Sequence, residues 1–203
     1  MIRSFLTTLL LFITLSVFSE GPLNIGIKFG TNRSKMITNF DNVLDQIVLE
    51  EDVNNYLAGA FVRLNLGRLY LQPEVYFNTK GGIIKPSNQD LVNSASTIFN
   101  YQTIDVPALI GIKLINRDLI NLRIHGGPVF SYITVNSFTT DIANFNTNDL
   151  NNQYVGWQLG AGIDIWFLTI DARIENSSNI LASTSDYKIR NRVYLLSAGI
   201  KLF

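Results

Sequence analysis

The chain has 203 residues, of which 16% are charged and 47% are hydrophobic, and its 16 acidic side chains balance 16 basic ones. The zero net charge argues against a nucleic-acid partner, which would require a basic surface. The absence of cysteine excludes disulfides, and one histidine leaves little for a metal site. The charged fraction is well below the roughly 25% of soluble domains.

The first 19 residues are expected to be a secretory signal peptide. Arg3 supplies a positive charge, residues 5–18 are mostly apolar, and Val17 and Ser19 precede a suitable cleavage site before Glu20. The apolar core is too short to cross a bilayer comfortably, which disfavours a membrane anchor. We therefore expect a signal peptide at 1–19 and one domain at 20–203.

The mature chain alternates apolar and polar residues in eight segments. A period of two is typical of β-strands, because successive side chains point to opposite faces. The segments are 24–31, 56–66, 69–79, 103–114, 120–131, 153–165, 168–175 and 190–203. Long polar connections are expected at 31–55, 80–100, 135–152 and 176–189, alternating with short turns. Pro73, Pro107 and Pro128 lie inside three segments, where we expect bulges or strand ends.

One face of each predicted strand is apolar, and the other mixes glycine with charge. The apolar faces contain no Asp, Glu, Lys or Arg, and a Lys or Arg at the bilayer midplane would cost about 2–4 kcal/mol. Aromatic residues fall mostly near predicted strand ends, where interface girdles belong: Tyr56, Phe77, Tyr132, Trp157, Trp166 and Tyr194. These features predict an all-β fold, an eight-stranded antiparallel up-and-down transmembrane β-barrel.

The alternative is a soluble lipocalin-type barrel with its apolar face inward. Its exterior would then be the face rich in glycine and tyrosine, which is unusual for a water-exposed surface. In the membrane interpretation the four long connections lie on one side and both termini on the other. Because bacterial outer-membrane barrels have short periplasmic turns, we expect both termini in the periplasm.

The inward faces bring opposite charges together in nearly equal number. The expected lumen residues are Lys28, Arg63, Glu74, Asp105, Lys113, Arg123, His125, Asp164, Asp171, Arg173, Glu175 and Lys201. Eight strands leave room only for side chains, so we interpret this set as a structural network that plugs the barrel. His125 is the only candidate base, and Ser131 and Asp171 are neighbours that a polar lumen offers by chance. We expect no catalytic, cofactor or metal site.

Five short motifs occur in order: Leu71-Gln72-Pro73-Glu74 with Tyr76, Ile104-Asp105-Val106-Pro107-Ala108-Leu109, Gly126-Gly127-Pro128, Leu159-Gly160-Ala161-Gly162-Ile163-Asp164 and Gly199-Ile200-Lys201-Leu202-Phe203. Together they resemble the PorT-type outer-membrane β-barrel family. The resemblance covers essentially the whole mature chain and implies an outer-membrane barrel. The namesake of the family has a part in protein export, so the resemblance also implies such a role here.

Three classes of function remain at this point. The leading one is a non-enzymatic scaffold or interaction barrel that displays long extracellular loops or assists protein export. The second is a porin-like conduit for small solutes. The third, an enzyme acting on lipid or peptide, is disfavoured because no His–Ser or His–Asp pair stands out. The expected partners are outer-membrane lipid and proteins of a secretion or surface system, with no nucleic acid and no cofactor.

Overall fold

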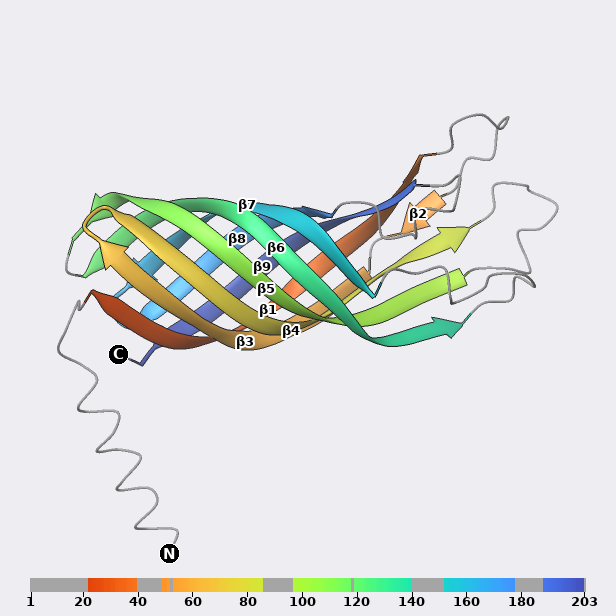
Figure 1. The fold of residues 1–203 in the computed structure, drawn as a ribbon, viewed down its shortest axis with the longest axis horizontal. Helices are drawn as coiled ribbons and strands as arrows, with labels where there is room; N and C mark the ends of the chain where they lie inside the picture. The colour runs from red at the N-terminus through yellow and green to blue at the C-terminus, as the bar shows by residue number, and fades with distance from the viewer. Residues whose placement is uncertain are drawn as a thin grey trace, which may run out of the picture.

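Long antiparallel strands wind around a common axis in the computed structural model (Figure 1). The structure describes residues 22–39, 49–51, 53–85, 97–117, 119–139, 152–177 and 188–202. The predicted signal peptide and Phe203 lie outside these residues. The strands are β1 Leu23–Asn39, β2 Leu49–Glu51, β3 Val53–Leu66, β4 Leu69–Lys85, β5 Thr97–Asn116, β6 Ile120–Thr139, β7 Gln153–Ile165, β8 Leu168–Ser177 and β9 Lys188–Lys201.

The strands close into a barrel. From β3 to β9 each strand pairs with the next one along the chain. β1 pairs with both β3 and β9, which closes the circle. The short β2 pairs with β4, from Leu49 opposite Lys85 to Glu51 opposite Ile83, just beyond the β3–β4 ladder. The closed wall therefore has eight antiparallel strands, which confirms the predicted fold.

The two ends of the barrel differ. One end, here called the turn end, carries the tight turns Gly67–Arg68 and Trp166–Phe167 together with Leu23 and Leu202. Backbone hydrogen bonds join each turn to a neighbouring strand there, from Lys113 N of β5 to Arg68 O at 2.8 Å and from Lys201 N of β9 to Phe167 O at 2.8 Å. The opposite end, here called the loop end, is where the chain leaves the described strands at residues 39, 85, 139 and 177.

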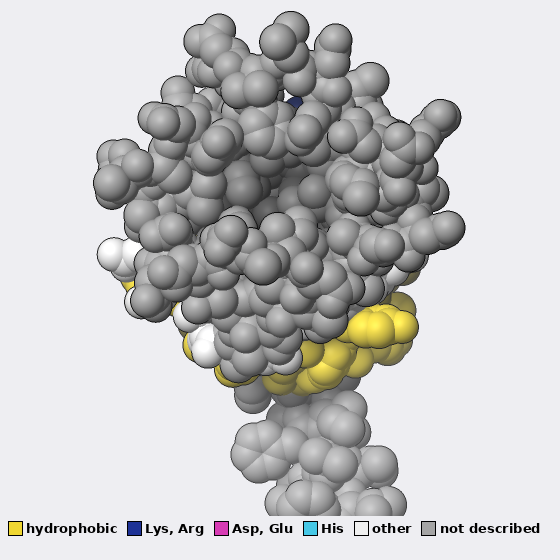
Figure 2. All heavy atoms as spheres, turned by 90° about the vertical axis from the view of Figure 1, so that its right-hand side faces the viewer, with side chains coloured by type: hydrophobic (Ala, Val, Ile, Leu, Met, Phe, Trp, Pro, Cys, Tyr) yellow, Lys and Arg dark blue, Asp and Glu magenta, His cyan; other side chains and the backbone are white. Residues whose placement is uncertain are grey.

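Side chains alternate between the lumen and the outer surface. In β8 every second residue from Thr169 to Ser177 is buried, and the residues between them are exposed. Large apolar side chains cover the outside, with Leu159 71% and Trp157 66% exposed, and yellow apolar side chains mark the visible outer wall in Figure 2. The lipocalin alternative is therefore wrong, because the polar face is inside. In the described part of the chain, no helix has the length and apolarity to span a membrane.

Several strands extend further toward the loop end than predicted. β1 continues to Asn39, β4 to Lys85 and β6 to Thr139, and β5 begins at Thr97. In these extensions apolar and polar residues no longer alternate along the sequence, while the backbone ladder continues. The expectation of an uncharged outer face was incomplete, because Arg33 on the extension of β1 and Arg192 within the last predicted segment point outward and are exposed.

The three prolines form neither bulges nor strand ends, contrary to expectation. Pro73 pairs with Ala108, Pro107 with Val129 and Pro128 with Trp157, all inside strands. The β5–β6 register shifts lie elsewhere, at Gln102/Thr103 and Lys113/Ile115. Each proline lacks an N–H, and the barrel accommodates this loss within an unshifted ladder instead of inserting a residue.

Candidate functional site: the charged lumen

Buried polar side chains fill the barrel interior. Among the described residues, the largest fully buried side chains include Arg63, Arg123, Lys80, Gln158 and Glu175. Buried charges are costly unless each is paired and hydrogen-bonded, so the contacts between strands decide how this interior is organised. They form two clusters joined by a central bridge.

The inner cluster, nearer the turn end, consists of Arg63, Arg123, Asp164 and Asp171. Arg63 Nη1 lies 2.7 Å from Asp164 Oδ2. Arg123 Nη2 lies 2.9 Å from Asp164 Oδ1 and 3.1 Å from Asp171 Oδ1. The four residues come from β3, β6, β7 and β8, so this cluster crosses the lumen and shares two carboxylates between two guanidinium groups.

Tyr70 lies between the two arginines of the inner cluster. The Arg63 and Arg123 guanidinium carbons lie 5.3 and 5.7 Å from its ring centroid, within cation–π range. The Tyr70 hydroxyl lies 3.1 Å from His125 Nδ1, and His125 Nε2 is 4.0 Å from Asp171 Oδ1. Ser131 lies six residues further along the same strand, roughly 20 Å away at the rise of a β-strand, so it cannot form a catalytic pair with His125.

The central bridge consists of Lys28, Glu74 and Arg173. Arg173 Nη1 and Nη2 each donate to a different oxygen of Glu74, both at 2.7 Å, and this two-point geometry is typical of strong arginine–carboxylate pairs. Lys28 Nζ donates to Glu74 Oε2 at 2.5 Å. Arg173 Nη2 also lies 3.3 Å from Asp171 Oδ2, which connects the bridge to the inner cluster.

The outer cluster, nearer the loop end, consists of Lys80, Asp105 and Glu175. Lys80 Nζ lies 2.9 Å from Asp105 Oδ2 and 2.5 Å from Glu175 Oε1, and it donates to the Tyr154 hydroxyl at 3.1 Å. Gln158 connects this cluster to the bridge, because its Nε2 donates to Glu175 at 2.8 Å and its Oε1 accepts from Arg173 at 3.5 Å.

The sequence analysis missed Lys80, which it assigned to a connection. The inward register of Tyr70, Gln72, Glu74, Tyr76 and Asn78 continues to position 80, and this was the signal that could have found it. All residues of the predicted set lie in the lumen register. Lys113 is buried and Lys201 half-buried, both near the turn end.

Glycine provides the space that the inner cluster occupies. A Cβ on Gly162 would lie 2.1 Å from Asp171 Oδ1 and 2.7 Å from Arg123 Nη2. A Cβ on Gly111 would lie 2.3 Å from the Tyr70 ring. In the described part of the chain, no three His, Cys, Asp or Glu residues are grouped so as to hold a metal ion. The arrangement is therefore one of mutual charge neutralisation in a tightly filled interior.

An eight-stranded barrel with an apolar outer wall and a charged, filled lumen defines a small membrane-embedded β-barrel. The chain belongs to the family of outer membrane protein beta-barrel domains, whose model matches residues 16–177. This family supports a location in the outer membrane. No curated protein is similar enough to count as a match.

Three solved structures are similar to this chain. OprG from Pseudomonas aeruginosa superposes with a TM-score of 0.50 at 8% identity, covering 88% of this chain and 95% of that one. Neisserial surface protein A gives 0.47 at 8% identity, with coverages of 87% and 96%. Ail, the attachment invasion locus protein of Yersinia pestis, solved with the heparin analogue sucrose octasulfate, gives 0.41 at 12%, with coverages of 89% and 99%. The likeness to OprG concerns the fold alone.

Proposed function

We propose that this protein is a plugged outer-membrane barrel that acts as a non-enzymatic scaffold. The observation that carries the proposal is the continuous set of buried contacts from Arg63 through Arg173 to Lys80. A selective pore is lined by one sign of charge and must leave a path for the ion. Here cations and carboxylates neutralise each other. Removing one partner of a buried pair would lower the stability of the barrel by several kcal/mol.

Conductance in planar bilayers tests the plug. Purified wild-type protein should show no steady conductance, measured against a general porin inserted under the same conditions. Arg173→Ala should lower the melting temperature in detergent without opening a channel, because neighbouring side chains still fill the lumen. Reproducible single-channel steps from the wild-type protein would contradict the scaffold and favour a porin-like conduit.

The proposed orientation puts the loop end outside the cell and both termini in the periplasm. The tight turns at the turn end support it, since outer-membrane barrels have short periplasmic turns. The chain has no cysteine, so single reporters can be introduced. On whole cells, Asn152→Cys should react with an impermeant thiol reagent and Asn116→Cys should not. Both positions are exposed and lie at opposite ends, and the reverse labelling would overturn the orientation.

The resemblance to the PorT type supports protein partners in a secretion or surface system as part of this proposal. Deleting residues 141–150 leaves β6 and β7 intact and should remove any partner held by that connection. Pull-down from detergent-solubilised outer membrane would compare this variant with wild type and with a matched deletion of 180–186. A partner lost with only one deletion supports the scaffold role. The same proteins captured on an unrelated barrel would contradict it.

A further inference from the structure

A basic patch lies on the outer wall at the loop end. Arg33 of β1 and Arg192 of β9 are both exposed on the outward register. In the β1–β9 ladder Arg33 is opposite Tyr194, and Arg192 is opposite Lys35. Further toward the loop end the same ladder contains Arg190 and Lys188, opposite Ile37 and Asn39. Five basic residues are thus placed along two paired strands that contain no Asp or Glu, beside the short β2, which contains Glu50 and Glu51.

Among the outward side chains whose exposure the structure describes at this level of the wall, the charged ones are Arg33 and Arg192. Around the rest of the loop end, the outward side chains whose exposure the structure describes are uncharged: Asn54, Tyr56, Phe77, Gln102, Tyr132, Thr134, Gln153, Val155, Trp157 and Asn176. Among the described side chains, the positive charge at this level therefore lies on one side of the barrel. A general need for interfacial anchors would distribute it around the circumference, so the asymmetry points to a ligand.

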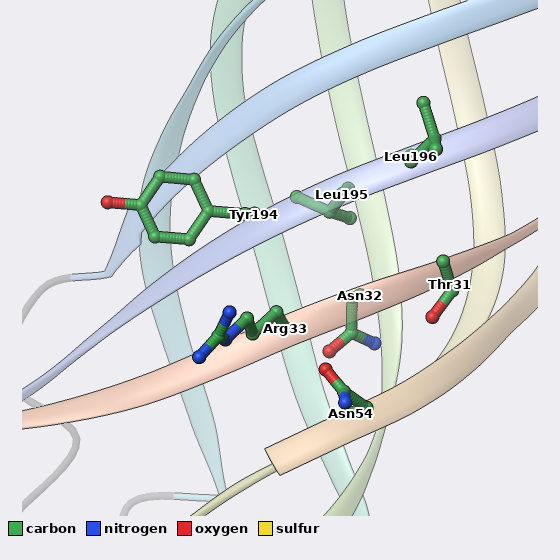
Figure 3. A pocket seen from close by; sticks show the side chains of 7 residues that line it. All are labelled: Thr31, Asn32, Arg33, Asn54, Tyr194, Leu195 and Leu196. Atoms are coloured by element: carbon green, nitrogen blue, oxygen red, sulfur yellow. The ribbon is translucent and has the colours of Figure 1, made fainter. Parts of the chain in front are cut away.

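The patch borders a pocket of about 220 Å³ between β1, β3 and β9 (Figure 3). Arg33, Asn54 and Tyr194 line its side toward the loop end, and Thr31 and Leu196 line its side toward the apolar wall. The Arg33 guanidinium and the Tyr194 hydroxyl both extend toward the loop end in Figure 3. Arg192 is oriented by its neighbour strand, since its Nε donates to Asn176 Oδ1 at 2.9 Å.

The level of the pocket along the barrel wall indicates which part of a lipid molecule it would contact. Tyr194 belongs to the exposed aromatic girdle at the loop end with Tyr56 and Trp157, and such girdles lie at the level of the lipid headgroups. Phe29 and Leu196 lie nearer the turn end and are exposed on the apolar outer wall, where they would face the hydrocarbon. A planar guanidinium at this level matches the two-point geometry of a phosphate, while the apolar side of the pocket suits an acyl chain.

We propose that Arg33, Arg192 and Tyr194 bind the phosphate of a phosphorylated glycolipid in the outer leaflet. The proposal rests on the orientation given under the proposed function, because only the outer leaflet presents this lipid at the loop end. The cysteine labelling tests that orientation without using these arginines, and conductance does not depend on them either. Failure of the lipid site is therefore distinguishable from failure of the scaffold.

Native mass spectrometry of the full mature protein in detergent, titrated with bisphosphorylated lipid A, tests the site. The double variant Arg33→Gln/Arg192→Gln should bind at least about tenfold more weakly, since two charge-assisted contacts are lost. The matched control Arg68→Gln/Arg117→Gln removes two exposed arginines at the turn end and should bind like wild type. Single variants of Arg33 and Arg192, each with an intermediate loss, replace the double variant if it fails to fold.

Three results would overturn the proposal. One is equal binding by wild type and the Arg33→Gln/Arg192→Gln variant. Another is equally tight binding of dephosphorylated lipid A, which would show that acyl chains alone are recognised. The third is equal, arginine-dependent binding of phosphatidylglycerol, which would show that the site does not distinguish the outer-leaflet glycolipid from an ordinary anionic phospholipid.

Discussion

The inner and outer clusters of the lumen hold their carboxylates in different ways. In the inner cluster, Asp164 contacts both Arg63 and Arg123, so either cation can be removed without leaving that carboxylate unpaired. In the outer cluster a single ammonium group, that of Lys80, contacts both Asp105 and Glu175. One arrangement is redundant and the other is not, although the burial is similar. The number of cations around each carboxylate, and not burial alone, should therefore set how much a substitution lowers the free energy of unfolding.

The largest effect is expected for Lys80→Met. The change leaves two buried carboxylates without their shared cation, and breaking a buried pair in this way costs about 3–5 kcal/mol. The free energy of unfolding, measured by urea titration in liposomes, should fall by that amount. The triple variant Lys80→Met/Asp105→Asn/Glu175→Gln removes the uncompensated charges as well and should recover much of the loss. A loss no greater than that of Arg63→Met would contradict the comparison.

Arg63→Met should have a smaller effect, about 1–3 kcal/mol, because it removes the donor to Gln72 and one of the two cations at Asp164. Asp164 retains Arg123 at 2.9 Å. The same urea titration can be applied to Arg63→Met, Arg123→Met and the double variant. Because each arginine substitutes for the other, the double variant should lose more than the sum of the single losses. Simple additivity would show that the two arginines act independently.

Gly162→Ala tests whether glycine makes room for the inner cluster. The added methyl would overlap Asp171 Oδ1 and Arg123 Nη2, and overpacking of this kind costs typically about 1–3 kcal/mol. Gly156 is a matched control on the same face of β7, because a Cβ there would lie 3.0 Å from its nearest neighbour, the Asn176 carbonyl oxygen. Gly156→Ala should therefore destabilise less in the same assay. Equal losses would mean that β7 requires glycine for reasons of backbone geometry.

The membrane-spanning part of the fold could be predicted because lipid imposes a strict pattern on it. Every outward residue between the girdles must be apolar, so a segment such as Leu168 to Ile174 reveals its faces directly. Toward the loop end that requirement ends. In β4 the last apolar outward residue before Lys80 is Phe77, and the next outward residue is Thr79, so the apolar–polar alternation ends just before Lys80 although the inward register continues to it. The predicted lumen set consequently includes all four residues of the inner cluster but lacks Lys80 of the outer cluster.

For the residues that alternation assigned to the lumen, the face could be predicted from the sequence but the partner could not. Glu74 and Arg173 are 99 residues apart and lie on strands that are not neighbours in the sheet. Contact across the lumen depends on strand tilt and stagger, which alternation in a single sequence does not specify. The same limit applies to the outer wall, where the Arg33 and Arg192 patch depends on the pairing of the first and last strands of the chain.

The smallest effect is expected for Lys28→Met in the central bridge, and it tests the comparison from the opposite side. Lys28 is as buried as Lys80, with 3% of its surface exposed against 0%. However, its carboxylate partner, Glu74, also accepts two hydrogen bonds from Arg173 and one from Gln72.

Glu74 therefore stays neutralised and hydrogen-bonded when Lys28 is removed, and the expected loss is only that of one hydrogen bond, about 1 kcal/mol. Urea titration of Lys28→Met and Lys80→Met under identical conditions compares the two directly, because the substitution and the depth of burial are matched. If the two losses were equal, burial of a lysine would set the cost. The expected difference of about 2–4 kcal/mol requires that the outer cluster depend on a single cation where the bridge has two.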